Sequence, residues 1–260
     1  MSPSWRDRVQ VFVAPQALRL AVRPRGWRSV AGETISLALP EDGAIDGLGH
    51  ELGTALAAHA RRGFDAHIVL SNAHVRYAVV ADAGLLSGDA ERDAAARQAL
   101  RSVYGEAADD WHIVMDEGSA GAALVAGVAR SLLEALRNAC AAAGAARVHI
   151  EPLFACAANA ALHDVGRDTG WLGVLEGGRV VLATVDAQGV AGVRTHRVLR
   201  NASDEIAALL QRARLLDGAP SERATLLLAS EEPADVVFAP ESGLRLRQLP
   251  LRATLAPEAA

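Results

Sequence analysis

Side chains that could carry out chemistry are present, but their spacing matches no catalytic or metal-binding pattern. The eight histidines are dispersed and form neither an H-x-H nor an H-E-x-x-H pattern, so the sequence predicts no metal site. Ser119, Asp116 and a distant histidine could supply a hydrolytic triad. However, Gly118–Gly121 lies between two expected strands and not at the strand-to-helix elbow that exposes a nucleophilic serine, which favours a plain turn.

The acidic and basic residues do not indicate a catalytic site either. The pairs Asp109–Asp110 and Glu231–Glu232 are adjacent in sequence, so their side chains point apart, which is more typical of solvated loops than of an acid–base dyad. All 26 basic residues are arginine. The absence of lysine excludes a Walker A loop, a Schiff-base lysine and a lysine general base.

Composition limits the remaining classes of protein. A hydrophobic content of 51% allows a sizeable core, whereas a net charge of −5 with 4% aromatic residues argues against a nucleic-acid surface. Cys140 and Cys156 lie in alanine-rich surroundings and are expected to be buried thiols in a reducing compartment. Residues 1–8 lack an apolar signal segment, and no uncharged apolar run reaches about 18 residues. We therefore expect a soluble, cytoplasmic protein.

The hub stretch, His67–Val80, consists of two strand-like runs joined at Ser71–Ala73. Ile68–Leu70 is continuously apolar, as in a strand covered on both faces, and alternation resumes from Val75. Three polar residues stand out in this stretch, namely Asn72, Arg76 and Tyr77. In the simplest interpretation Asn72 stabilises the turn, Arg76 faces water, and Tyr77 packs with its hydroxyl group at the surface.

The elements around the hub follow from periodicity and from turn residues. In the first half we expect strands at 9–13, 17–23, 33–39, 112–115, 122–128 and 147–150, and helices at 45–62, 90–104, 131–144 and 154–163. In the second half we expect strands at 171–175, 179–185, 193–199 and 225–229, and a helix at 204–216 with Ser203 as its N-cap.

Both halves follow the order β-β-β-α-β, and 225–229 takes the place in the second half that the first strand of the hub takes in the first. The sequence thus predicts an α/β protein with two lobes. These are residues 1–165 with an α+β insert at about 81–146, and residues 166–250, followed by a flexible tail at 251–260. The alternative is an unrelated α+β fold whose halves look alike by chance.

This duplicated order resembles the actin-like superfamily, whose lobes are ribonuclease H-like. Within it, the chain is similar to the bacterial actin-like protein of type IV pilus assembly (the PilM family) and to the cytoplasmic domain of the type II secretion inner-membrane protein (the GspL family). The likeness spans about residues 9–246 and is carried by Val69–Asn72 with Val75–Tyr77, by Val103–Glu106, by Val128–Leu136 and by Gly192–Val198.

The resemblance implies where a nucleotide would bind. Actin-like ATPases hold phosphates on two hairpin turns in which an Asp-x-Gly start positions Mg²⁺ and lets backbone N–H groups approach. The corresponding turns here are Ala14–Gln16, which has no carboxylate or glycine and includes Pro15, and Glu176–Gly178, which has them in a different order. The segment Ser230–Pro233, expected near an adenine, is acidic. We therefore predict a pseudo-ATPase that has no catalytic residues, no bound cofactor and no enzymatic activity.

The resemblance also implies a role and a partner. The chain is expected to be a non-catalytic scaffold of a type IV pilus or type II secretion platform, associated with the inner membrane through the cytoplasmic segment of a membrane protein. Asn72, Arg76 and Tyr77 would then line a groove that receives this peptide. The chain is not expected to bind nucleic acid or to insert into the membrane, and it could form a homo-oligomer. A divergent actin-fold ATPase or small-molecule kinase is the alternative.

Overall fold

The structure is a computed structural model, and it describes residues 6–23, 34–39, 45–116, 121–165, 170–186, 189–217, 225–231, 234–238 and 243–251. The described residues form two compact units. The first unit holds the residues up to His74 together with Val128–Leu153. The second holds Val75–Gly127 and Phe154–Leu251. The expected turn at Ser119, the pair Glu232–Pro233 and the tail after Leu251 lie outside the described residues.

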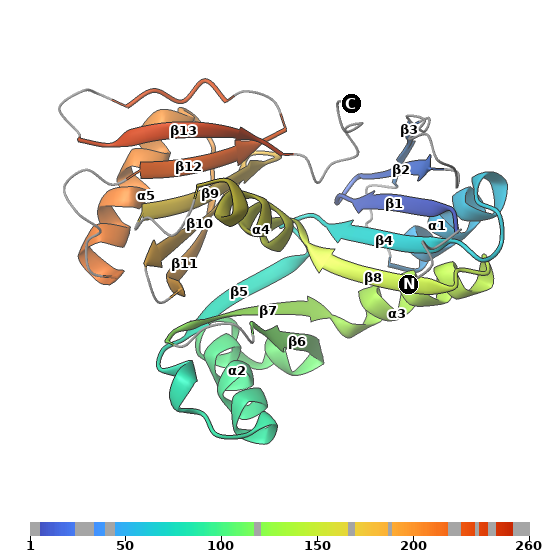
Figure 1. Ribbon diagram of the computed structural model, residues 1–260, viewed down its shortest axis with the longest axis horizontal. Helices are drawn as coiled ribbons and strands as arrows, with labels where there is room; N and C mark the ends of the chain where they lie inside the picture. The colour runs from blue at the N-terminus through green and yellow to red at the C-terminus, as the bar shows by residue number, and fades with distance from the viewer. Residues whose placement is uncertain are drawn as a thin grey trace. The chain divides into compact units, whose positions relative to one another are not determined.

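The first unit contains a five-stranded sheet in the order β3-β2-β1-β4-β8 (Figure 1). Its strands are β1 (Arg8–Val13), β2 (Ala17–Arg23), β3 (Thr34–Ala38), β4 (Asp65–Leu70) and β8 (Arg147–Pro152). The pairs β1–β2 and β2–β3 are antiparallel, whereas β1, β4 and β8 run parallel. Ile68, Val69 and Leu70 are all buried, which confirms the prediction that the first strand of the hub is covered on both faces.

Helices α1 (Ile45–His59) and α3 (Arg130–Ala142) pack against each other in this unit (Figure 1). Gly144, with φ 84°, follows the end of α3 as expected for a helix C-terminus, whereas Gly63, with φ 86°, lies four residues after α1, which ends before the predicted residue 62. The N–H group of Gly63 donates to the carbonyl of Gly144 at 2.8 Å, so the two helix ends are joined. Cys140 on α3 is fully buried, and this burial raises the pKa of its thiol to about 11. Cys156 is only half-buried.

The second unit contains a sheet of the same order, β11-β10-β9-β12-β13. Its strands are β9 (Gly170–Glu176), β10 (Arg179–Asp186), β11 (Gly189–Arg197), β12 (Thr225–Ser230) and β13 (Arg245–Pro250). The pairs β9–β10 and β10–β11 are antiparallel, and β9, β12 and β13 run parallel. The two sheets therefore share order and strand direction, which confirms the predicted duplication. Strand β13 was not predicted, because its Arg245 and Arg247 interrupt the apolar pattern.

Helix α5 (Ala202–Asp217) packs on β10 and β11 and closes the core of this sheet. The core is a cluster of buried side chains from the sheet and from one face of the helix: Trp171, Val180, Leu182, Ile206, Leu210, Leu226 and Leu228. The β9–β10 hairpin turns through Gly177 and Gly178, whose φ values are 51° and 70°. Two successive residues with positive φ are the signature of a type I′ turn, which suits glycine.

A third sheet, in the order β5-β7-β6, also belongs to the second unit. It is formed by β5 (Val75–Val80), β6 (Trp111–Met115) and β7 (Ala123–Ala129), and α2 (Asp89–Tyr104) packs on β5 and β6. Short 3₁₀ helices, η1 (Ala83–Leu85) and η2 (Gly105–Asp110), flank α2. A separate apolar cluster that includes Ala96, Leu100 and Val125 lies between helix and sheet. The two runs of the hub thus belong to different sheets.

The two compact units are defined by contacts, whereas the predicted lobes follow the repeat in the sequence. Residues 130–152 supply α3 to the first unit and β8 to its sheet, although the expected insert extended to residue 146. Strand β5 lies beside β11, the edge strand of the second sheet, so the third sheet joins the second unit. The predicted lobes, residues 1–165 and 166–250, follow that repeat, and their boundaries stay a prediction. Helix α4 (Leu153–Val165) begins where the two units meet in the sequence. No described helix has the length and apolar composition needed to cross a membrane.

Candidate functional site

The turn after β4 is held by Ser71. Its N–H group donates to the carbonyl of Val13 at 2.9 Å, and its own carbonyl accepts from the N–H group of His74 at 3.0 Å. Its hydroxyl oxygen accepts from the N–H group of Ala73 at 3.1 Å. Asn72 beside it is buried, with 1% of its surface exposed. Ser71 thus supplies these three contacts of the turn, and the stabilising role expected of Asn72 stays a prediction.

Arg76 and Tyr77 follow on β5, in the second unit, and their side chains point to opposite faces of the strand. Arg76 is half-buried, and its Nη1 donates to the carbonyl of Val75 at 3.0 Å. Tyr77 is 4% exposed and its ring packs on Phe154 at a centroid distance of 5.5 Å. Tyr77 is thus a core residue, and the expectation of a surface hydroxyl group is wrong. The role of these residues in partner binding stays a prediction.

Burial has an electrostatic consequence for Tyr77. Loss of solvation raises the pKa of its hydroxyl well above the usual value near 10, and the charges of Glu176 and Cys156 raise it further. The hydroxyl group therefore stays protonated at physiological pH. The hydroxyl group of Tyr104 donates to the main-chain carbonyl of Tyr77 at 3.4 Å, which links α2 to β5. Tyr77 thus connects β5 to α4 through Phe154 and to α2 through Tyr104, all within the second unit.

The first expected phosphate turn, Ala14–Gln16, is closed by its own backbone. The N–H group of Ala14 donates to the carbonyl of Ala17 at 2.9 Å, and the carbonyl of Gln16 accepts from Leu39 at 2.8 Å. Pro15 has no N–H group to offer. In the second turn the carbonyl of Gly178 accepts from Val198 at 2.7 Å. Of the acidic segment after β12, Glu231 is exposed, and residues 232–233 lie outside the described residues.

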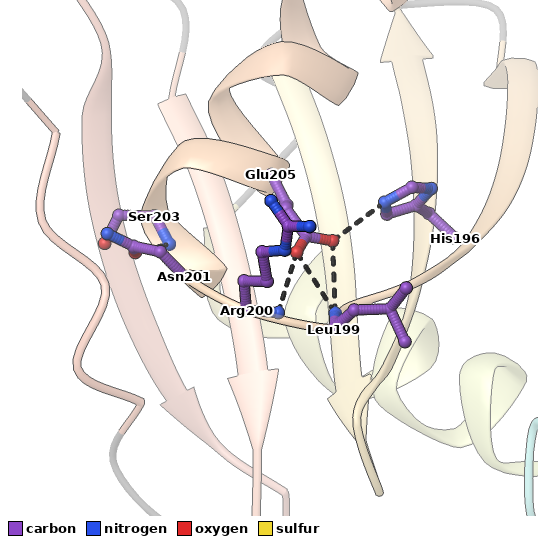
Figure 2. A network of polar contacts seen from close by, with 6 residues as sticks. All are labelled: His196, Leu199, Arg200, Asn201, Ser203 and Glu205. Carbon is purple, nitrogen blue, oxygen red and sulfur yellow. Dashed lines mark hydrogen bonds and ion pairs between the residues drawn. The ribbon is translucent and has the colours of Figure 1, made fainter.

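A polar network surrounds the start of α5 (Figure 2). The carboxylate of Glu205 accepts from the N–H group of Arg200 at 2.8 Å, from that of Leu199 at 3.1 and 3.2 Å, and contacts His196 Nε2 at 3.1 Å. Partial burial opposes the ionisation of Glu205, but the N–H groups of Arg200 and Leu199 and the imidazole of His196 outweigh it and lower its pKa. A single carboxylate thus joins β11 to the first turn of the helix.

The residue that caps α5 is Asn201. Its side-chain oxygen accepts from the N–H group of Ser203 at 2.9 Å, which makes Asn201 the N-cap in place of the predicted Ser203. The hydroxyl oxygen of Ser203 instead accepts from the N–H group of Val237 at 3.0 Å, linking the helix to the segment before β13. Sequence reasoning missed this network. The available signal in the sequence was the pair Asn201 and Glu205, an asparagine followed four residues later by a glutamate.

The same region forms an open pocket of about 550 Å³, lined among others by Arg197, Arg200, Arg212 and Asp204. Its guanidinium groups and the helix N-terminus would attract a carboxylate, whereas Asp204 would oppose one. The carboxylate of Glu205 is already held by backbone donors and His196, which leaves it few lone pairs for a ligand. The network is therefore best understood as the structural anchor of α5.

We expect replacement of Glu205 by glutamine to lower the melting temperature at neutral pH. The pKa of Glu205 is lower in the folded chain than its usual value of 4.5, so the carboxylate stabilises the fold above that value. This contribution is lost as the pH falls through the folded-state pKa. The difference between wild type and Glu205→Gln should therefore shrink as thermal unfolding is measured from neutral to acidic pH.

Asp204→Asn is the matched control, because Asp204 lies in the same first turn of α5 and carries the same charge. It interacts with the helix dipole in a similar way, whereas the contacts with His196, Leu199 and Arg200 belong to the carboxylate of Glu205. If both variants lower the melting temperature equally, the charge at the helix end accounts for the decrease, and not the hydrogen bonds to Leu199 and Arg200.

Comparison with known proteins concerns the fold. No known family model matches the sequence, and no curated protein matches it. A protein from Bacteroides thetaiotaomicron with an actin-like ATPase fold and unknown function is 8% identical, with a TM-score of 0.59 over 89% of this chain and 84% of that chain. A chain of the PilM–PilN type IV pilus biogenesis complex is 14% identical, with a TM-score of 0.58 over 93% of this chain and 88% of its own.

A third similar structure is the cytoplasmic domain of EpsL, an inner-membrane component of the type II secretion system of Vibrio cholerae. It is 15% identical, with a TM-score of 0.54 over 96% of this chain and 92% of its own. The likeness spans nearly the whole of each chain, and the two sheets described above repeat one order and one set of strand directions. The chain therefore has the two-lobed actin-like fold that its sequence predicts.

Proposed function

We propose that this chain is a non-catalytic cytoplasmic scaffold of a type IV pilus or type II secretion inner-membrane platform, and that it binds a cytoplasmic peptide of a membrane partner. The observation that carries the proposal is the first hairpin turn, Ala14–Gln16. The backbone of this turn is engaged within the sheet, and the turn has no carboxylate for Mg²⁺ and no glycine for close approach of a phosphate. A protein that keeps the fold but lacks this chemistry is suited to binding other proteins.

Two of the similar structures support the choice of partner class. One is a chain of the PilM–PilN complex, and the other is the cytoplasmic domain of an inner-membrane secretion component. Each covers more than nine-tenths of this chain. By analogy, the membrane attachment of this chain would come from a partner whose short cytoplasmic segment docks on it.

The rival proposal is a divergent actin-fold ATPase or small-molecule kinase. It is favoured by the Gly177–Gly178 turn, whose left-handed glycines resemble the backbone that approaches phosphates in such enzymes. Calorimetric titration of the 260-residue chain with millimolar Mg-ATP separates the two proposals. We expect no saturable heat of binding, and a saturable isotherm would favour the enzyme.

The scaffold is tested by affinity purification of the tagged chain from detergent-solubilised membranes of its host. We expect a single-span inner-membrane protein of the pilus or secretion machinery to co-purify through its cytoplasmic tail. Recovery of soluble proteins without any such membrane protein would contradict the proposal.

A point substitution then tests the predicted contact surface. Arg76→Glu reverses a half-buried charge on β5, whereas Arg101→Glu reverses one on the exposed part of α2, where Arg101 pairs with Asp109 at 3.5 Å. If Arg76 contacts the peptide, only Arg76→Glu should weaken binding of the synthetic tail. Equal binding by both variants would remove Arg76 from the contact surface but leave the scaffold proposal standing. Tyr77 is less suitable for this test, because it is a core residue.

A further inference from the structure

Three potential metal ligands lie together on one face of the first sheet, on adjacent parallel strands. His67 is on β4, and His149 and Glu151 are on β8. The register pairs His67 with His149 and Val69 with Glu151. Because side chains two positions apart on a strand point to the same side, all three project from the same face. Their imidazole nitrogens and carboxylate oxygens lie within 4.8 Å of one another.

Within this cluster, both imidazoles contact the same carboxylate. Nε2 of His67 contacts Oε1 of Glu151, and Nε2 of His149 lies 3.8 Å from Oε2 of the same carboxylate. The two imidazole rings have a centroid distance of 5.3 Å. Glu151 is thus placed between two imidazoles, each of which directs a nitrogen towards it. Donor atoms around a tetrahedral Zn²⁺ ion lie about 3.4 Å apart, so small side-chain rotations would bring the three into coordination.

We propose that His67, His149 and Glu151 form a binding site for a divalent transition-metal ion, with Zn²⁺ as the best-suited ion. Two imidazoles and one carboxylate are a ligand set that Zn²⁺ accepts, and three protein ligands leave at least one coordination position open to water or to a side chain of another molecule. The site would bind metal whether or not the chain acts as a scaffold. The solvent exposure of the His149 side chain, 69%, gives an ion a path to enter.

The surrounding charges favour this class of metal over Ca²⁺ or Mg²⁺. In the next row of the same face, Asp65 is in register with both Arg8 and Arg147, so positive charges accompany this carboxylate. Hard cations need several oxygen ligands and an excess of negative charge. A borderline metal is held mainly by its bonds to imidazole nitrogens, which tolerate neighbouring arginines better.

One more residue suits a supporting role. Gln10 on β1 is in register with His67, so the two side chains share this face. Its Oε1 atom is a buried acceptor without a hydrogen-bond partner among the described residues. Metal-bound imidazoles usually donate their second ring N–H to a carbonyl or carboxylate, which fixes the orientation of the ring. Gln10 is the side chain that could accept this bond from His67 when Nε2 binds the metal.

The test uses the 260-residue chain without a polyhistidine tag, stripped of metal with a chelator and titrated with Co²⁺ and then with Zn²⁺. We expect one Co²⁺ per chain with the visible absorption of a four- or five-coordinate ion, and without a thiolate charge-transfer band, because no cysteine belongs to the cluster. Zn²⁺ should displace Co²⁺ and should raise the melting temperature of the wild type. The absence of saturable binding would overturn the proposal.

Two variants identify the ligands. His149→Ala removes a largely exposed side chain, so the sheet should fold, and Glu151→Gln keeps the shape of the side chain but removes its charge. Each should weaken binding by at least about 100-fold, more than the loss of a supporting hydrogen bond, and should abolish the rise in melting temperature. His59→Ala, at the exposed end of α1, is the control and should bind as the wild type does. Wild-type affinity in either cluster variant would refute the site.

Discussion

Replacement of Gly170 by alanine is expected to lower the free energy of unfolding by about 3 kcal/mol. Gly170 begins β9, where it pairs with Thr225 on one side and with Val185 on the other. A Cβ atom at this position would lie 2.5 Å from the carbonyl oxygen of Thr225. Because this oxygen belongs to the backbone of a neighbouring strand, it cannot rotate away. Relief would require β9 to shift in the middle of the sheet, which would weaken both ladders.

Gly173→Ala is the matched control on the same strand. A Cβ atom there would meet only side-chain ends, the Cδ1 atoms of Leu228 at 3.0 Å and of Leu226 at 3.4 Å. These leucines can adjust, and alanine also reduces the entropy of the unfolded chain, so the net change should be under about 1 kcal/mol. Urea unfolding of both variants measures the difference. A loss in Gly170→Ala no larger than that in Gly173→Ala would show that the strand start absorbs the added methyl group.

The second large effect is expected at Trp171, which is 1% exposed in the core of the second sheet. Its ring packs in the cluster that α5 closes, and the guanidinium group of Arg214 lies 5.3 Å from the ring centroid. Trp171→Ala should cost about 3–5 kcal/mol, because it removes a large, fully buried side chain and leaves a cavity. Trp171→Phe should cost less, because a ring remains in place.

A double-mutant cycle with Arg214→Met separates packing from the cation–π contact. Arg214 Nη2 and Trp171 Nε1 are buried and have no hydrogen-bond partner among the described residues, and the guanidinium group lies over the face of the ring. We expect a coupling energy of about 1–2 kcal/mol between the two positions. Additive losses would instead assign the whole effect to the cavity.

The metal site and the scaffold are independent proposals, and their experiments can fail separately. Metal binding depends on three side chains of the first unit, whereas the charge reversal at Arg76 probes the second unit. The chain could therefore prove to bind Zn²⁺ and no peptide, or the reverse. If both hold, the metal position that the protein leaves open offers a place where a histidine or carboxylate of a partner could bind.

The local order of elements could be predicted from the sequence because it depends on periodicity and on turn residues. Strand β2 has the predicted limits, and the other predicted strands and helices lie within a few residues of their expected ends. The repeat of β-β-β-α-β was sufficient to indicate the fold, since each half buries one sheet with its own apolar pattern. Strand β13 was missed because it is an edge strand whose exposed arginines hide its pairing with β12.

The candidate sites depended on more than local pattern. Tyr77 has the alternation of a half-exposed strand, yet its contact with Phe154 buries it, and this contact joins residues far apart in the chain. The capping role of Asn201 was visible only once Glu205 and Ser203 were placed around it. A residue type tells which bonds are possible, whereas burial and neighbours decide which of them form.

The sequence by itself determined the duplicated α/β order, the absence of lysine and the lack of a carboxylate or glycine in the turn Ala14–Gln16, because each of these is a property of neighbouring residues. Only the tertiary structure decided that β4 and β8 are adjacent and in register, which brings His67, His149 and Glu151 onto one face. The physical reason is that strand pairing between segments about 80 residues apart follows from the packing of the whole sheet, and no local spacing records it.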